Sequence, residues 1–268
     1  MSFYKIAGGL AQPRTKEELQ REIKIRLDRG QTNLNDIDTS KITDMSNLFN
    51  NLDRNIDVSL WDVHNVTDMR CMFYECSYFN CDLSHWDVSK VKEMGGMFCG
   101  CTDFNSDLSK WDVSNVTNMN NMFYSCYHFN CDLSGWDVSK VENMSNMFDS
   151  CTRFNCDLSK WDVSNVEKMS FMFYKCSSFN SDLSNWNTHN VQNMAFMFYN
   201  CKNFNSNISK WDVRKVKNTS FMFENCTRFD CDLSKWDIRN IRNMRDMFDD
   251  SGMTMNPTWY EVDVRRGY

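Results

Sequence analysis

The sequence predicts an α/β repeat solenoid of about nine coils, preceded by an N-terminal capping helix. Each coil of 25 residues is expected to contain one short parallel β-strand and one short helical or 3₁₀ segment. Tryptophan recurs every 25 residues from Trp61 to Trp236, and phenylalanine keeps the same spacing from Phe73 to Phe248. The 268 residues include two prolines and nine glycines, so few residues interrupt the pattern. Because a fixed period of about 20–50 residues is the signature of stacked repeats, we expect one continuous array over residues 36–250.

The tryptophan column marks the coils. Its members are Trp61, Trp86, Trp111, Trp136, Trp161, Trp186, Trp211 and Trp236. An earlier, degenerate unit has Ile37 in this column and Phe49 in the phenylalanine column, and it is one residue shorter. The pattern fails after Phe248, so residues 251–268 are expected to form a C-terminal cap.

Each unit combines two apolar periodicities. The stretch from Leu108 to Val113 alternates around Trp111, which predicts a short strand. The apolar residues that follow recur every three or four positions, which predicts a short helix or 3₁₀ turn. They are Val116, Met119, Met122, Phe123 and Cys126. One unit has an apolar face and nothing to cover it, so stability has to come from packing between coils.

The N-terminal cap is predicted to contain a helix over residues 14–30. Thr15 and Glu18 form a capping box, and Gly30 is suited to end the helix. One apolar face is expected to cover the first coil; it consists of Leu19, Ile23 and Leu27. We therefore divide the chain into a cap of residues 1–35, the repeat array and the C-terminal cap.

Charge and composition limit the classes of partner. The net charge is −6; residues 201–268 hold 12 Lys/Arg and 10 Asp/Glu, against 18 and 26 in residues 1–200. This balance points to neither nucleic acid nor a membrane surface, and no stretch reaches the ~18 apolar residues of a membrane span. The first ten residues lack the pattern of an export signal. Together with an odd number of cysteines, 13, this favours a cytoplasmic, reducing location.

Cysteines form a column of their own: Cys76, Cys101, Cys126, Cys151, Cys176, Cys201 and Cys226. We expect them to be small core residues. Coils about 4.8 Å apart would also allow disulfides between neighbours, and a metal site is a further alternative. There is no C-x-x-C pair and no histidine completes a site, so we predict neither a metal nor a cofactor. Five residues after some of these lie the members of a second column: Cys81, Cys131, Cys156 and Cys231. Cys71 and Cys99 lie outside both columns and are expected to be the exposed thiols.

Two other repeated sets favour structural roles. The methionines that recur with Met119 and Met122 are expected in the core, beside the phenylalanines. Ladders of Asn and Asp, such as Asn105 and Asp107, are suited to bond backbone amides in the same turn of every coil. Catalysis needs an asymmetric cluster, whereas these groups appear many times.

One column breaks the period. Asn121 and Asn146 are followed at the same position by phenylalanine in three successive coils, and tyrosine stands three residues later in two of them. Such a stripe on a column that is otherwise polar or small predicts an interface. The alternative is that it tucks under a cap or turns inward. The candidate partner-binding residues are Phe171, Phe196, Phe221, Tyr174 and Tyr199, with a basic rim of Arg214, Lys215, Arg242 and Arg245 that could steer an acidic partner.

The repeat resembles that of the BspA-like leucine-rich-repeat surface proteins, which have units of 25–26 residues. The resemblance rests on segments such as Trp111-Asp112-Val113-Ser114-Asn115-Val116-Thr117-Asn118-Met119 and Met122-Phe123-x-x-Cys126. It extends over about residues 36–250. It implies a right-handed, leucine-rich-repeat-like solenoid, a role in adhesion or partner binding, a place at the cell surface, and no catalytic residues.

The sequence therefore predicts a protein-interaction or adhesion scaffold that is not an enzyme, with a protein partner of unknown identity. The alternative is a structural protein that assembles with itself, as a homodimer or filament, through the stripe or the solenoid ends. An enzyme would need a cleft of unique sequence, and only the caps are unique.

Overall fold

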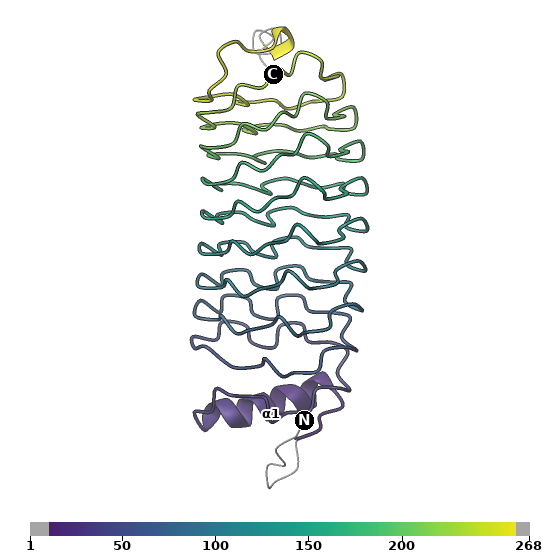
Figure 1. The fold of residues 1–268 in the computed structure, drawn as a ribbon, viewed down its shortest axis with the longest axis vertical. Helices are drawn as coiled ribbons and strands as arrows, with labels where there is room; N and C mark the ends of the chain where they lie inside the picture. The colour runs from purple at the N-terminus through teal and green to yellow at the C-terminus, as the bar shows by residue number, and fades with distance from the viewer. Residues whose placement is uncertain (1–10, 261–268) are drawn as a thin grey trace.

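The computed structural model describes residues 11–260, which form a rod of stacked coils (Figure 1). Helix α1, Lys16–Asp28, lies across the N-terminal end, and successive coils follow one another to the C-terminal end, where residues 258–260 make a short helical turn. The expected caps extend into residues 1–10 and 261–268, which lie outside the described residues.

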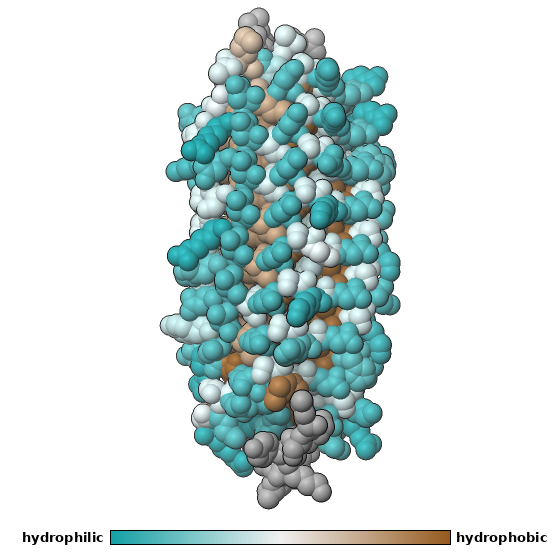
Figure 2. Space-filling model, viewed as in Figure 1, coloured by the Kyte–Doolittle hydropathy of each residue, from teal (hydrophilic) through white to brown (hydrophobic). Residues whose placement is uncertain are grey.

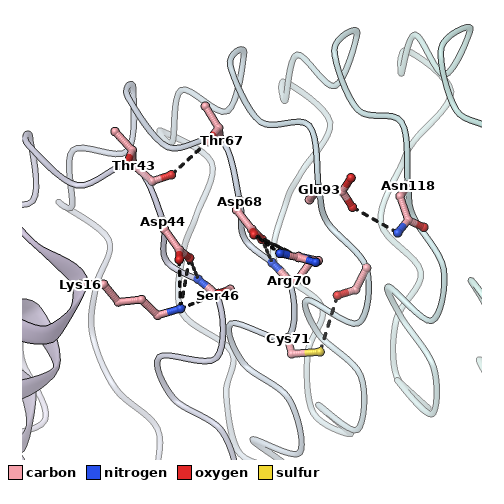
Figure 3. A network of polar contacts seen from close by, with 11 residues as sticks. Lys16, Thr43, Asp44, Ser46, Thr67, Asp68, Arg70, Cys71, Glu93 and Asn118 are labelled. Carbon is pink, nitrogen blue, oxygen red and sulfur yellow. Dashed lines mark hydrogen bonds and ion pairs between the residues drawn. The ribbon is translucent and has the colours of Figure 1, made fainter.

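Helix α1 lies inside the range predicted for it. The Thr15 side chain accepts a hydrogen bond from the Glu18 amide at 3.2 Å, while the Glu18 carboxylate accepts one from the Arg14 amide at 2.7 Å. Leu19 and Ile23 are buried against the first coil. Lys16 reaches over that coil and pairs with Asp44 at 3.2 Å (Figure 3). Capping stabilises the start of the helix, and the buried Leu19 and Ile23 together with the Lys16–Asp44 ion pair hold it on the array.

The coils are joined by single-residue parallel bridges, and the described residues contain no longer strand. One series of bridges runs from Asp44–Asp68 to Asn218–Asn243, through the column that contains Glu93 and Asn118. The stretch around Trp111, where the alternation predicted a strand, has no bridge. Its backbone turns instead, because the Trp111 amide donates to the Leu108 carbonyl of the same coil at 3.1 Å.

The segment after the bridge is not helical, although its apolar spacing predicted a helix or 3₁₀ turn. Asn121 and Ser125 have φ of 55° and 57°, and equivalent residues repeat these positive values in every coil. The three residues between them do not have positive φ, and alternate amides of this segment face the neighbouring coil. Four amides donate to the next coil at 2.8–3.0 Å: Met119 to Asn143, Asn121 to Ser145, Phe123 to Met147, and Ser125 to Asp149.

The core runs the length of the rod. Phe98 and Phe123 are fully buried and stack with ring centroids 5.7 Å apart. The Trp111 indole nitrogen donates to the Leu83 carbonyl at 3.0 Å, and this bond repeats from coil to coil. At the C-terminal end, Trp259 donates in the same way to Leu233 at 3.2 Å, which extends the tryptophan arrangement past the last repeat.

Candidate interaction surface

The predicted aromatic residues form a continuous stripe. We define the aromatic stripe as Phe171, Phe196, Phe221, Tyr174 and Tyr199. The phenyl rings stack in sequence with centroids 4.6 Å and 4.5 Å apart, and the two phenol rings stack at 4.8 Å. All five side chains are partly exposed. The alternative that the stripe turns fully inward is therefore excluded.

The contact between Phe171 and Tyr174, 5.5 Å between ring centroids, joins residues three apart, which the predicted helix or 3₁₀ turn would also place on one face. It has a different origin. Phe171, Phe196 and Phe221 all have left-handed backbone, with φ of 59°, 57° and 59°. For a bulky residue this is an outlier that costs of the order of 1–3 kcal/mol. The same column holds Asn121, Asn146 and glycine elsewhere, which are residues suited to this conformation.

The basic residues differ in whether their side chains have a polar partner. Arg214 forms an ion pair with Asp212 at 2.6 Å, and Arg245 pairs with Asp246 at 2.9 Å while lying 5.5 Å from the Phe221 ring. Lys215 donates to the Asn190 side chain at 2.6 Å. Arg242 is exposed. Arg245 thus touches the stripe, whereas Arg214, Lys215 and Arg242 lie beside it.

Two hollows lie among the basic residues, and one of them reaches the residue that precedes Phe171 in the chain. One, of about 280 Å³, is lined by Gln192, Arg214, Lys215, Lys217, Asn240 and Arg242. The other, of about 340 Å³, shares Gln192 and Lys217 with the first and extends to Ser170, the residue before Phe171. Lys217 therefore joins the two parts of one surface.

The column of Lys217 changes sign along the rod. From the N-terminal side it reads Glu142, Glu167, Gln192, Lys217 and Arg242. The four charged residues are exposed, and none of them takes part in an ion pair among the described residues. The two glutamates are not among the residues predicted to bind a partner. The signal for them in the sequence is the reversal of charge along this 25-residue column.

A buried carboxyl group lies at one end of the stripe. Asp149 occupies the tyrosine column, one coil before Tyr174, and is 5% exposed. Its burial raises its pKa to about 6, against the opposing effects of the Ser150 hydroxyl, which donates to it at 2.8 Å, and of the Lys175 charge. Lys175 lies 5.0 Å from the centre of the Tyr174 ring.

The cysteine column is a core column, with no disulfide among its members. Each thiol donates to a carbonyl oxygen of a neighbouring coil, as Cys126 does to Phe98 at 3.0 Å. Burial raises the pKa of Cys226 to about 12. A second column accepts a backbone amide instead: Leu108 donates to the Cys131 sulfur at 3.1 Å, and serine takes this role at Ser106.

The prediction that Cys71 and Cys99 are the exposed thiols is wrong for Cys99. Cys71 is partly exposed, but Cys99 is only 6% exposed, because it shares a column with the larger Tyr74 and Tyr124 of the coils on either side. Cys231, a member of the second column, is partly exposed instead. Cys71 and Cys99 line one hollow of about 570 Å³, between Tyr74 and Tyr124. Burial raises the pKa of Cys99 to about 12, which disfavours a reactive thiolate.

The polar ladders have the structural role that was predicted. The Asn105 side chain accepts the amide of Asn130 in the next coil at 2.8 Å, and the Asp107 carboxylate accepts the Ser109 amide at 2.9 Å. Figure 2 shows the result on one face, where hydrophilic side chains cover most of the rod and narrow hydrophobic bands run lengthwise between them. Acidic ladders of this kind are backbone caps.

Over residues 11–260, no group of three or more His, Cys, Asp or Glu side chains is arranged to hold a metal ion. In the same range, no helix has the length and hydropathy needed to cross a membrane.

Among protein families, one described as "Mycoplasma protein of unknown function, DUF285" matches four overlapping segments: residues 21–126, 82–176, 105–202 and 151–260. The overlaps reflect the repeats, and together the segments extend over most of the chain. No curated protein matches the sequence.

Proposed function

We propose, from the premise that the chain belongs to this DUF285 repeat family, that it is a non-enzymatic protein-interaction scaffold. Its binding surface would be the aromatic stripe together with the basic residues beside it. The observation that carries the proposal is the left-handed backbone of Phe171, Phe196 and Phe221. Three bulky residues occupy a conformation that asparagine adopts at lower cost in neighbouring coils.

Strained residues of this kind cluster at functional sites, where the strain is retained for another purpose. Partly exposed, mutually stacked rings present a rigid apolar surface that loses little side-chain entropy on binding. Arg245 on Phe221, and Lys217 in the adjoining hollows, add positive charge at the edge. Both features favour a protein partner that offers apolar and acidic groups to this face.

The repeated polar side chains and the protonated thiols support a role other than catalysis. Most polar side chains repeat from coil to coil and bond backbone amides, as Asn105 and Asp107 do. The hollow of about 570 Å³ between Tyr74 and Tyr124 contains two thiols, Cys71 and Cys99, whose pKa values are raised by burial. Protonated thiols are poor nucleophiles and poor metal ligands.

We further propose that the coils are a variant of the leucine-rich-repeat solenoid, related to the BspA-like proteins, and that adhesion is one form which partner binding takes. Support comes from the 25-residue period and from the single parallel contact between neighbouring coils.

Self-assembly is a second candidate, favoured by the reversal of charge along the column from Glu142 to Arg242. A surface whose two ends carry opposite charge can complement a reversed copy of itself.

A site-specific cross-link tests the interaction surface. A photoreactive phenylalanine analogue is placed at Phe196, and a matched control carries it at Asn121, which has the same backbone conformation in another coil. We expect a protein adduct, formed in cells that express the chain, from position 196 and not from position 121. Equal adducts at both positions, or none at 196, would contradict the proposal.

A further inference from the structure

We infer that the occupant of the aromatic stripe is a second copy of this chain, packed face to face and antiparallel about a two-fold axis that crosses the rod at Gln192 and Phe196. This inference rests on the proposed function, since it takes the stripe to be an interaction surface, and it goes further by naming the partner and its orientation.

The charged column reverses its sign about Gln192. Glu142 and Glu167 precede Gln192, and Lys217 and Arg242 follow it, at successive intervals of 25 residues. The charges are thus antisymmetric about Gln192. All four charged side chains are exposed, and none of them forms an ion pair within the described chain. A charge pattern that reverses about its own centre is complementary to itself after a half-turn.

The aromatic column has the matching symmetry about the same coil. Phe196 is at its centre, Phe171 and Phe221 lie one coil to either side, and the next positions are Asn146 and Asp246. Apolar contact therefore occupies the centre and polar residues the two ends. This is the arrangement of a hydrophobic interface core inside a polar rim.

A two-fold axis lying in the contact plane, perpendicular to the rods, leaves each column facing the same column in reverse order. Glu142 then faces Arg242 of the second copy, and Glu167 faces Lys217. In the phenylalanine column of the stripe, Phe196 faces Phe196, and Phe171 faces Phe221. In the tyrosine column, Tyr199 faces itself and Tyr174 faces Glu224. Each pairing occurs twice, so the four charges of each copy are all matched, as an isologous contact requires.

The columns between these two are compatible with close approach. The residues directly before the phenylalanines are Ser170, Ala195 and Ser220, all small. In the bridge column, Lys168 would face Asn218 and Asn193 would face itself. No two like charges meet in either column.

The surface is small. Five coils about 4.8 Å apart extend over roughly 20 Å, which is below the dimensions of standard-size interfaces, and contacts at the low end of the size range are weak. The dimer is therefore expected to depend on concentration, and charge complementarity contributes much of its specificity.

Light scattering over a concentration series tests the inference, with charge-reversed variants. The wild type is expected to approach twice its 31.8 kDa chain mass. Lys217→Glu/Arg242→Glu and Glu142→Lys/Glu167→Lys each place like charges opposite one another, and each should weaken the dimer more than about 100-fold. An equimolar mixture of these two variants should dimerise again, because every contact between them is complementary, and so should the chain that carries all four substitutions.

The control variant Lys210→Glu/Lys235→Glu changes the net charge by as much as Lys217→Glu/Arg242→Glu does, but on exposed residues of another column. It should leave the dimer intact. A wild type that stays monomeric at all concentrations, or a mixture that stays monomeric, overturns the antiparallel dimer. If the adduct from position 196 then contains a different protein, the proposed function stands and only its self-association form fails; if there is no adduct, both fail.

Discussion

The phenyl ring of Phe196 lies parallel to that of Phe221, with centroids 4.5 Å apart and 14° between the ring planes, although both residues have a left-handed backbone. The stacking offsets part of the conformational cost. An aromatic pair contributes about 0.5–1.5 kcal/mol beyond its buried area, whereas left-handed backbone costs about 1–3 kcal/mol for each bulky residue. The stripe is consequently a weak contributor to the stability of a single chain.

Replacing the whole stripe should therefore leave the monomer folded. We expect Phe171→Asn/Phe196→Asn/Phe221→Asn to change the free energy of unfolding by less than about 2 kcal/mol, because relief of backbone strain offsets lost stacking. Phe198→Ala, two residues from Phe196 but fully buried, should cost about 3–5 kcal/mol. Urea denaturation at concentrations that keep the chain monomeric compares the two. A triple variant as unstable as Phe198→Ala would show that the stripe is core.

In the second cysteine column, two substitutions of Cys131 are expected to differ in their effect on stability. Cys131→Ser should be neutral within about 0.5 kcal/mol, since Ser106 already accepts the equivalent leucine amide at 3.2 Å. Cys131→Ala removes the acceptor of the Leu108 amide and should cost about 1–3 kcal/mol. Thermal unfolding distinguishes them, and equal melting temperatures for the two variants would refute this role of the sulfur.

The buried carboxyl group of Asp149 predicts how stability changes with pH. Its pKa is raised to about 6 in the folded chain, from 3.8, so the folded state binds more protons than the unfolded state between these values. Stability from this group therefore increases as pH falls from about 7 to about 4, by up to roughly 3 kcal/mol. Asp149→Asn should stabilise the chain at pH 8 and reduce the gain on acidification; melting curves of both proteins at pH 8 and pH 5 measure this difference.

Exposure predicts which thiols react. Cys71 and Cys231 are partly exposed and the other 11 cysteines are buried. Brief treatment of the native chain with iodoacetamide at mildly alkaline pH should label these two, and unfolding in urea should make all 13 reactive. Peptide mass spectrometry assigns the sites. Early labelling of Cys99 would show that the hollow between Tyr74 and Tyr124 opens further than its 6% exposure indicates.

The sequence reveals the columns but not the backbone that connects them. A strict period shows that Trp111 meets its equivalents and that Met119, Phe123 and Cys126 point inward. The same three- and four-residue spacing arises from a helix and from the observed turns, in which Asn121 and Ser125 are left-handed. Phenylalanine at the Asn121 position in later coils hides the signal further, because bulky residues disfavour this conformation.

The candidate interaction surface was only partly predictable for a similar reason. The aromatic stripe stood out because it interrupts a repeat. The interior location of Cys99 depends on how closely its coil packs, and the pairing of Arg214 with Asp212 depends on side-chain geometry that spacing does not determine.

The four amides that each coil donates to the next have an electrical consequence. The peptide groups before Met119, Asn121, Phe123 and Ser125 all direct N–H toward the C-terminal end and C=O toward the N-terminal end. Peptide groups aligned in this way add their dipoles of about 3.5 D, so this side of the rod has its positive pole at the C-terminal end, the reverse of an α-helix. Two rods side by side in opposite directions would bring each positive pole next to a negative one, and two rods in the same direction would repel.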